Sequence, residues 1–178
     1  MREFSISKTL DWVDQRKPLQ FLAILYVARW IVVAPLFPLN RILFSSETLE
    51  KGSVEASQFS QGPVLLLFIF VILAPLIETL IECLLPYFIV SRVRNYRDSR
   101  PERCWGFIAI SACAMGVYHP MLSAIVPALI TGTFLAYCYA HFAEKSIWQA
   151  ILATIGFHGA INLVGWAIVV MQQSIQGG

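Results

Sequence analysis

Long apolar runs dominate the chain and alternate with short polar segments. A helix needs about 20 mostly apolar residues to cross a bilayer. The pattern predicts an all-α fold, a polytopic integral membrane helical bundle of about five spans, forming one domain over residues 19–172 with a tail at 173–178. We expect the spans at about residues 19–39, 63–90, 104–118, 121–140 (or 127–140) and 147–171.

The first 18 residues are amphipathic. Phe4, Ile6, Leu10 and Val13 follow roughly helical spacing among basic residues, which favours a short helix lying in the membrane interface. A partly disordered tail is the alternative.

The charges predict the orientation of the bundle. The N-terminal segment is basic, residues 40–62 are slightly acidic, and residues 91–103 are rich in arginine. Because positive residues near span ends favour the cytoplasm, we expect a cytoplasmic N-terminus. Hydrophobic residues make up 57% of the chain and charged residues 13%, and the net charge is only +2, so we expect the lipid bilayer as a partner and no nucleic acid. The cysteines show no CxxC spacing and are interpreted as apolar fillers.

Two carboxylates interrupt the second apolar run. Glu78 and Glu82 are four residues apart and share one helical face. An ionisable group inside a span costs about 2.5–3.5 kcal/mol or more, so it suggests a functional site. Pro75, one turn earlier, cannot donate its backbone hydrogen bond and should kink the helix.

Polar residues of three spans fall at a similar depth. At a rise of about 1.5 Å per residue, Glu78, His119 and His158 lie roughly 17–22 Å from the inner side, and Asn162 shares the face of His158. We therefore expect a polar site near the bilayer midplane. An irregular segment over residues 120–127 would line its cavity.

These residues form motifs that resemble a known family. The motifs are Ala74-Pro75-Leu76-Ile77-Glu78-Thr79, Gly116-Val117-Tyr118-His119 and Phe157-His158-Gly159-Ala160-Ile161-Asn162. In this order, over a protease-like core at residues 63–165, they resemble the CPBP intramembrane proteases. That family covers CAAX proteases and bacteriocin-processing enzymes, including type II CAAX prenyl endopeptidases and lysostaphin-resistance-protein-A-like proteins. The resemblance implies a membrane-embedded endopeptidase, which we expect in the bacterial inner (cell) membrane.

The chain departs from the family pattern at two positions. Thr79 replaces a second glutamate, and Cys83 stands where an arginine is usual. Arg29 lies near the depth of Glu82 in the first span, so we hypothesise that an Arg29–Glu82 ion pair supports the site and leaves Glu78 free to act.

The residues allow hydrolysis by an activated water. Glu78 would act as general base and His119 would hold the water, while His158 and Asn162 would donate to the oxyanion of a peptide carbonyl. The resemblance favours this mechanism without a cofactor. The alternative is zinc bound by Glu78, His119 and His158.

Other functions remain open. Each polar residue could instead join helices by hydrogen bonds. A catalytically inactive membrane scaffold or a bacteriocin-immunity protein of the same fold is the main alternative to an enzyme, and a proton-coupled transporter is a third. For an enzyme we expect a membrane-associated peptide or protein substrate, whether or not it is prenylated.

Overall fold

The computed structural model describes residues 6–43, 63–92, 105–119 and 122–176, and all of its regular structure in these ranges is helical. The elements before the first gap are α1 (Ile6–Asp14), α2 (Pro18–Val33) and α3 (Leu36–Leu43). The next ones are α5 (Pro63–Phe68), η2 (Ile69–Leu73), α6 (Ala74–Glu78), η3 (Thr79–Leu84) and α7 (Leu85–Ser91). The last are α8 (Trp105–Tyr118), α9 (Leu122–Ala143) and α10 (Ile147–Gln176).

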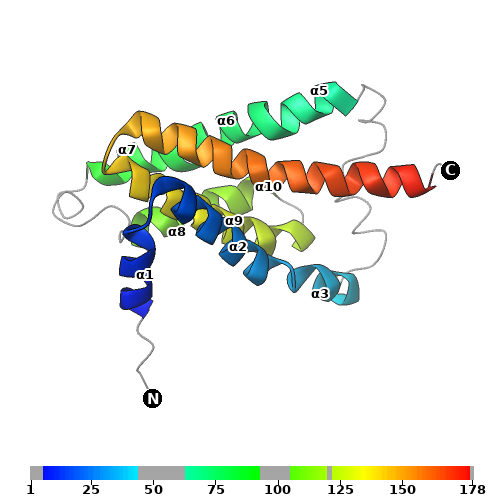
Figure 1. The fold of residues 1–178 in the computed structure, drawn as a ribbon, viewed down its shortest axis with the longest axis horizontal. Helices are drawn as coiled ribbons and strands as arrows, with labels where there is room; N and C mark the ends of the chain where they lie inside the picture. Colours follow the sequence, from blue (N-terminus) through cyan, green and yellow to red (C-terminus); the bar gives the residue numbers. More distant parts are fainter. Residues whose placement is uncertain (1–5, 44–62, 93–104, 120–121, 177–178) are drawn as a thin grey trace, which may run out of the picture.

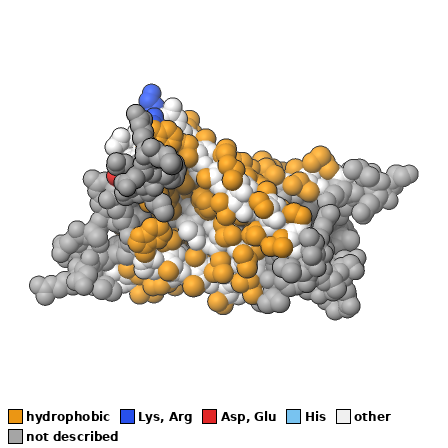
Figure 2. All heavy atoms as spheres, turned by 90° about the horizontal axis from the view of Figure 1, so that it is seen from below, with side chains coloured by type: hydrophobic (Ala, Val, Ile, Leu, Met, Phe, Trp, Pro, Cys, Tyr) orange, Lys and Arg blue, Asp and Glu red, His pale blue; other side chains and the backbone are white. Residues whose placement is uncertain are grey.

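The lengths of the helices confirm an all-α polytopic membrane bundle. Four apolar helical stretches can cross a membrane, namely Pro18–Leu39, Val64–Ser91, Ala124–Ala143 and Ile147–Ile168. The remaining predicted span is the shorter apolar helix α8, of 14 residues. Apolar side chains cover the middle of the face in Figure 2, and the charged side chains visible there lie toward the end that carries α1. This distribution suits a protein whose middle contacts lipid.

The long helices lie roughly side by side, and α1 runs across their end (Figure 1). Two contacts fix α1 to α9. The hydroxyl of Tyr137 donates to Oδ1 of Asp14 at 2.6 Å, and Nδ1 of His141 lies 3.4 Å from the same oxygen. The buried ring of Phe21 stacks on His141 with 3.9 Å between the ring centroids. The helix expected within residues 1–18 is therefore confirmed over Ile6–Asp14.

The sequence analysis made predictions about the polar loops between the spans and about the segment over residues 120–127. Residues 44–62 and 93–104, which contain most of the polar loops used to predict the orientation, lie outside the described residues. The irregular segment expected over residues 120–127 is wrong beyond Leu122, because α9 begins there and includes Pro127. This proline removes only the bond to the carbonyl of Ser123, which lies in the first helical turn. Among the described residues, helical structure thus resumes at Leu122.

The hairpin of α8 and α9 packs closely through glycine. A Cβ atom built on Gly132 would lie 2.8 Å from Cβ of Met115 and 2.9 Å from Cα of Ala112. The absence of a side chain at Gly132 therefore allows the two helix backbones to approach, as small residues commonly do between membrane helices.

We predict that Gly132→Ala destabilises the protein by about 1–3 kcal/mol, because overpacking at a backbone contact forces the helices apart. Gly165→Ala is the matched control, since a Cβ there meets nothing within 4 Å. Thermal unfolding of the purified variants in detergent measures the difference. Equal unfolding temperatures for the two variants would contradict this packing.

Candidate active site

The helix that carries Glu78 changes register before and after it. In the π-helical turn η2, the amide of Ala74 donates to the carbonyl of Ile69, five residues earlier. In the same register the next amide would bond to the carbonyl of Phe70, but residue 75 is proline and has no N–H. Pro75 therefore leaves the carbonyl of Phe70 without a backbone donor.

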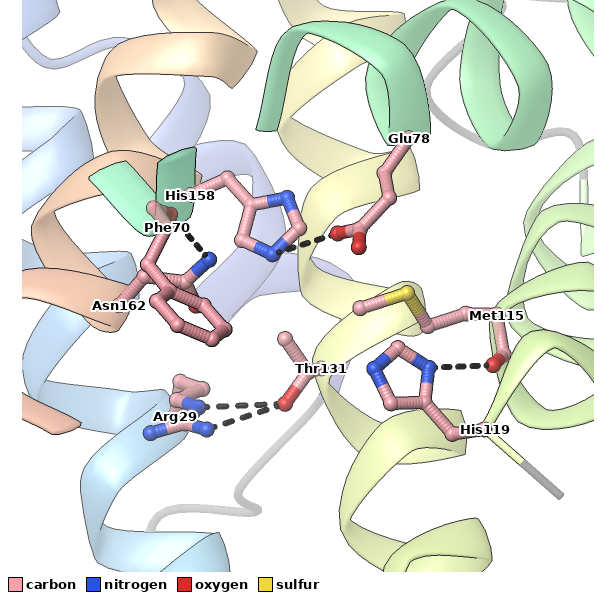
Figure 3. Close-up of polar contacts among 8 residues, drawn as sticks. All are labelled: Arg29, Phe70, Glu78, Met115, His119, Thr131, His158 and Asn162. Atoms are coloured by element: carbon pink, nitrogen blue, oxygen red, sulfur yellow. Dashed lines mark hydrogen bonds and ion pairs between the residues drawn. The ribbon is translucent and has the colours of Figure 1, made fainter. Parts of the chain in front are cut away.

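Asn162 supplies the donor that Pro75 lacks. Its Nδ2 atom donates to the carbonyl of Phe70 at 2.9 Å, from α10 to η2 (Figure 3). A carbonyl left without a partner inside a membrane would cost several kcal/mol. The bond thus satisfies the backbone and fastens α10 beside the helix that carries Glu78.

Gly159 permits this close approach. A Cβ atom on Gly159 would lie only 2.6 Å from the carbonyl oxygen of Val71, so a side chain there would push the two helices apart. Gly159 and Asn162 are three residues apart and lie on the same side of α10. Together they explain why His158, beside Gly159 in the chain, reaches Glu78.

The centre of the site is the contact between Glu78 and His158. Nε2 of His158 lies 3.2 Å from Oε2 of Glu78. Only 3% of the His158 side chain and 12% of the Glu78 side chain are exposed, so the two polar groups meet in the interior. The other imidazole nitrogen of His158 is buried and has no hydrogen-bond partner among the described residues. The structure thus brings together Glu78 and His158, two of the three residues that were expected at one depth.

His119 directly follows α8 and faces the same region. Its Nδ1 atom lies 3.0 Å from the carbonyl of Met115, and because a carbonyl only accepts, Nδ1 carries the proton of this bond. Figure 3 shows the other ring nitrogen turned away from the carbonyl of Met115, toward the interior that Glu78 and Thr131 also face. His119 makes no direct hydrogen bond to Glu78 or His158 in the described structure.

The hypothesised ion pair between Arg29 and Glu82 is wrong. Nε and Nη2 of Arg29 donate instead to Oγ1 of Thr131, at 3.3 and 3.1 Å. Oε1 of Glu82 is buried and has no hydrogen-bond partner in the part of the chain that the structure describes. The two residues share a depth, but α2 packs mainly against α9, whereas η3 packs against α8, α9 and α10. Similar depth alone therefore did not make them neighbours.

Thr131 was missed by the sequence analysis. Its only signal was a hydroxyl residue within an apolar span, and such residues are common between membrane helices. Its partner could not be inferred because that depends on the rotation of α9 toward α2.

The zinc alternative does not fit the described side chains. Among residues 6–43, 63–92, 105–119 and 122–176, no three His, Cys, Asp or Glu side chains come together as a possible metal site. We derive no step through a metal.

Comparison with known families gives a match over most of the chain. A family model described as type II CAAX prenyl endopeptidase Rce1-like matches residues 60–164, more than half of the 178-residue chain. The chain belongs to this family. The matched residues include the described site on α6, α8 and α10, whereas Arg29 precedes them. No curated protein and no solved structure matches the chain.

A double-mutant cycle between Asn162 and Pro75 tests the role of Asn162 in this Rce1-like protein. We predict that Asn162→Leu destabilises the protein by about 1–3 kcal/mol, because it leaves the carbonyl of Phe70 buried without a donor. In a Pro75→Ala background the penalty should be smaller, since residue 75 then has an N–H for that carbonyl. Unfolding in detergent of the native chain, both single variants and the double variant measures the coupling. An identical penalty in the two backgrounds would contradict the assignment.

Proposed function

We propose that this member of the Rce1-like family is an intramembrane endopeptidase that hydrolyses a peptide bond with water activated by Glu78. The observation that carries the proposal is the contact of 3.2 Å between the buried side chains of Glu78 and His158. It supports an enzyme because an acid and an imidazole meet inside an apolar bundle, where polar groups are costly. The family match supports a peptidase of this general class.

In the proposed reaction, Glu78 takes a proton from water while the water oxygen attacks the peptide carbonyl carbon. The π electrons of the carbonyl move to its oxygen and form a tetrahedral oxyanion. When the oxyanion collapses, the C–N bond breaks and the leaving nitrogen takes the proton from Glu78. This cycle returns Glu78 to its carboxylate form and requires no covalent enzyme intermediate.

The two histidines take separate roles in this proposal. With its proton on Nδ1, a neutral His119 has Nε2 free to accept a hydrogen bond from the water and orient it. Nε2–H of His158 holds the Glu78 carboxylate before the reaction. Once Glu78 has taken the proton from water, the same N–H donates to the oxyanion as charge develops there. Asn162 is proposed primarily as a positioning residue, because its amide donates to Phe70.

The departures from the family pattern favour one alternative. Thr79 and Cys83 are neutral and buried, with 2% of each residue exposed, so they supply no charge to the site. A scaffold or bacteriocin-immunity protein that has lost turnover is therefore the second candidate.

For the enzyme we propose a membrane-associated peptide or protein substrate, with a prenylated tail, a leader peptide and a membrane segment as the candidate classes.

We further propose that the end of the bundle with α1 faces the cytoplasm of a bacterial cell. The exposed side chains of Arg92 and Lys145 lie near the ends of the spans there, which is the placement that the positive-inside rule favours. Accessibility labelling of single cysteines would test this orientation.

We predict that Glu78→Gln abolishes cleavage while leaving the protein at its native level. Glutamine keeps the size of the side chain but cannot accept the proton in the proposed reaction. The measurement compares the termini of membrane proteins in cells that carry the native chain, Glu78→Gln or the exposed control Glu144→Gln. Termini present with the native chain and the control, but absent with Glu78→Gln, would identify both the activity and its substrate.

Identical termini in all three strains, together with an unchanged cellular phenotype, would contradict the endopeptidase and favour the scaffold. Equal protein amounts in the membrane fraction are required for this comparison, because a loss of folding would mimic a loss of catalysis.

A further inference from the structure

Five polar groups around η3 are buried and have no hydrogen-bond partner among the described residues. η3 itself contributes the hydroxyl of Thr79 and Oε1 of Glu82. The helices that pack against η3 contribute one hydroxyl each, from Ser111 of α8, Tyr139 of α9 and Thr154 of α10. These five residues are at most 3% exposed, so their side chains face the interior of the bundle. They are called the interior polar groups below.

The hydroxyl side chains among the interior polar groups do not bond to their own helices. Thr133 shows the usual bond of this kind, since its Oγ1 donates to the carbonyl of Leu129, four residues earlier, at 2.9 Å. The three Ser and Thr residues of the interior polar groups make no such bond within the described ranges. Thr154 lies beside the thiol of Cys138, which is only a weak hydrogen-bond partner. Their hydroxyl groups can therefore bind a ligand in the interior.

Glu82 and Thr154 lie one helical turn from the contact between Glu78 and His158. The helix that carries Glu78 continues through η3 and α7 toward the end of the bundle with α1, whereas α10 begins at that end (Figure 1). Glu82 follows Glu78 by four residues and Thr154 precedes His158 by four, so each lies on the same face as its neighbour and one turn nearer α1. The two residues thus form a second polar layer under the candidate active site.

The other interior polar groups extend this layer in both directions. Thr79 directly follows Glu78, at the level of the active site. At a rise of about 1.5 Å per residue, Ser111 lies roughly 9 Å from the start of α8, and Tyr139 lies roughly 6 Å from the end of α9. The interior polar groups therefore run from the last turn of α9 to the residue beside Glu78.

Water is the ligand that fits these groups. Buried polar groups in native proteins almost always have a hydrogen-bond partner, and an internal water molecule typically supplies about three bonds at once. The interior polar groups offer hydroxyl and carboxyl oxygens, which water can bond as donor or acceptor. A metal ion is a poorer fit, because the described His, Cys, Asp and Glu side chains form no group of three. A larger ligand would not reach side chains that are at most 3% exposed.

We propose that Glu82 and the hydroxyl groups of Ser111, Tyr139 and Thr154 bind a chain of internal water molecules that leads from the α1 end to Glu78. Thr79 binds the last molecule of this chain. The binding of water follows from the interior polar groups alone, whereas its use in hydrolysis rests on the proposed endopeptidase. In that reaction each turnover consumes one water molecule beside Glu78, and the next molecule of the chain replaces it.

Radiolytic footprinting of the full chain in detergent tests for this water. A short X-ray pulse converts water to hydroxyl radicals, which oxidise the side chains that the water touches. Tyr139 is the reporter, because it is 0% exposed and bulk water does not reach it. We expect mass spectrometry to detect oxidation of Tyr139 in the folded native chain, since internal water bonds to its hydroxyl.

Substitutions among the interior polar groups should weaken this footprint. Thr154→Val removes a hydroxyl at nearly constant size, and Glu82→Leu removes the carboxyl group. Each should lower the rate of Tyr139 oxidation about 2- to 10-fold, the change in occupancy that follows from the loss of one hydrogen bond to water. Thr154→Ser keeps the hydroxyl and should keep the rate. Thr133→Val is the matched control, because the hydroxyl of Thr133 bonds to its own helix, and the rate should not change.

Three results would overturn the water chain. They are a native chain in which Tyr139 is not oxidised, a rate that neither Thr154→Val nor Glu82→Leu changes, and an equal decrease in Thr133→Val, which would indicate a general change in packing. If Glu82→Leu does not fold, Thr154→Val alone decides between these outcomes.

The same variants separate the water chain from the proposed function. In cells, Thr154→Val should reduce the protein termini that depend on Glu78, and Thr154→Ser should retain them. A footprint that responds to Thr154→Val together with unchanged termini would contradict the supply of water to the reaction. Termini that are absent even with the native chain would contradict the endopeptidase, while the footprint would still decide whether the water chain exists.

Discussion

The hydrogen bond from Asn162 to the carbonyl of Phe70 is the contact on which the arrangement of the site depends. Pro75 and the π-helical turn before it leave that carbonyl without a backbone donor, and the hydrocarbon region of a membrane offers no water in its place. Gly159 lets α10 come close enough for the bond to form. The helices bearing Glu78 and His158 are thereby held together, and their side chains meet at 3.2 Å.

The way the backbone compensates for Pro75 also determines where Glu78 lies. A proline in a spanning helix usually requires compensation from neighbouring helices or an adjusted register. Here both kinds are present, since the register becomes π-helical and an amide from α10 satisfies the remaining carbonyl. The same segment that accommodates Pro75 is followed directly by Glu78, so the position of the acid follows from how the backbone around the proline is satisfied.

The sequence was sufficient for the spans and for the depth of the central residues, because both follow from apolar length and helical rise. Glu78 and His158 could be paired on that basis. The Arg29–Glu82 pair failed because depth does not determine which way a helix is turned, and Arg29 turns toward Thr131. The role of Asn162 was also not predictable, since its partner is a backbone carbonyl that becomes available only in the π-helical register. The segment after Leu122 was misjudged because α9 includes Pro127 despite the loss of one backbone hydrogen bond.

The central claim is that Glu78 and His158 contact each other inside the bundle. A double-mutant cycle with Glu78→Leu, His158→Leu and both together, followed by unfolding in detergent, measures this contact most directly. Each single substitution leaves the other polar group buried and unpaired, so we predict a non-additive result with a coupling energy of about 0.5–3 kcal/mol. Additive effects would contradict the contact and the site that is built on it.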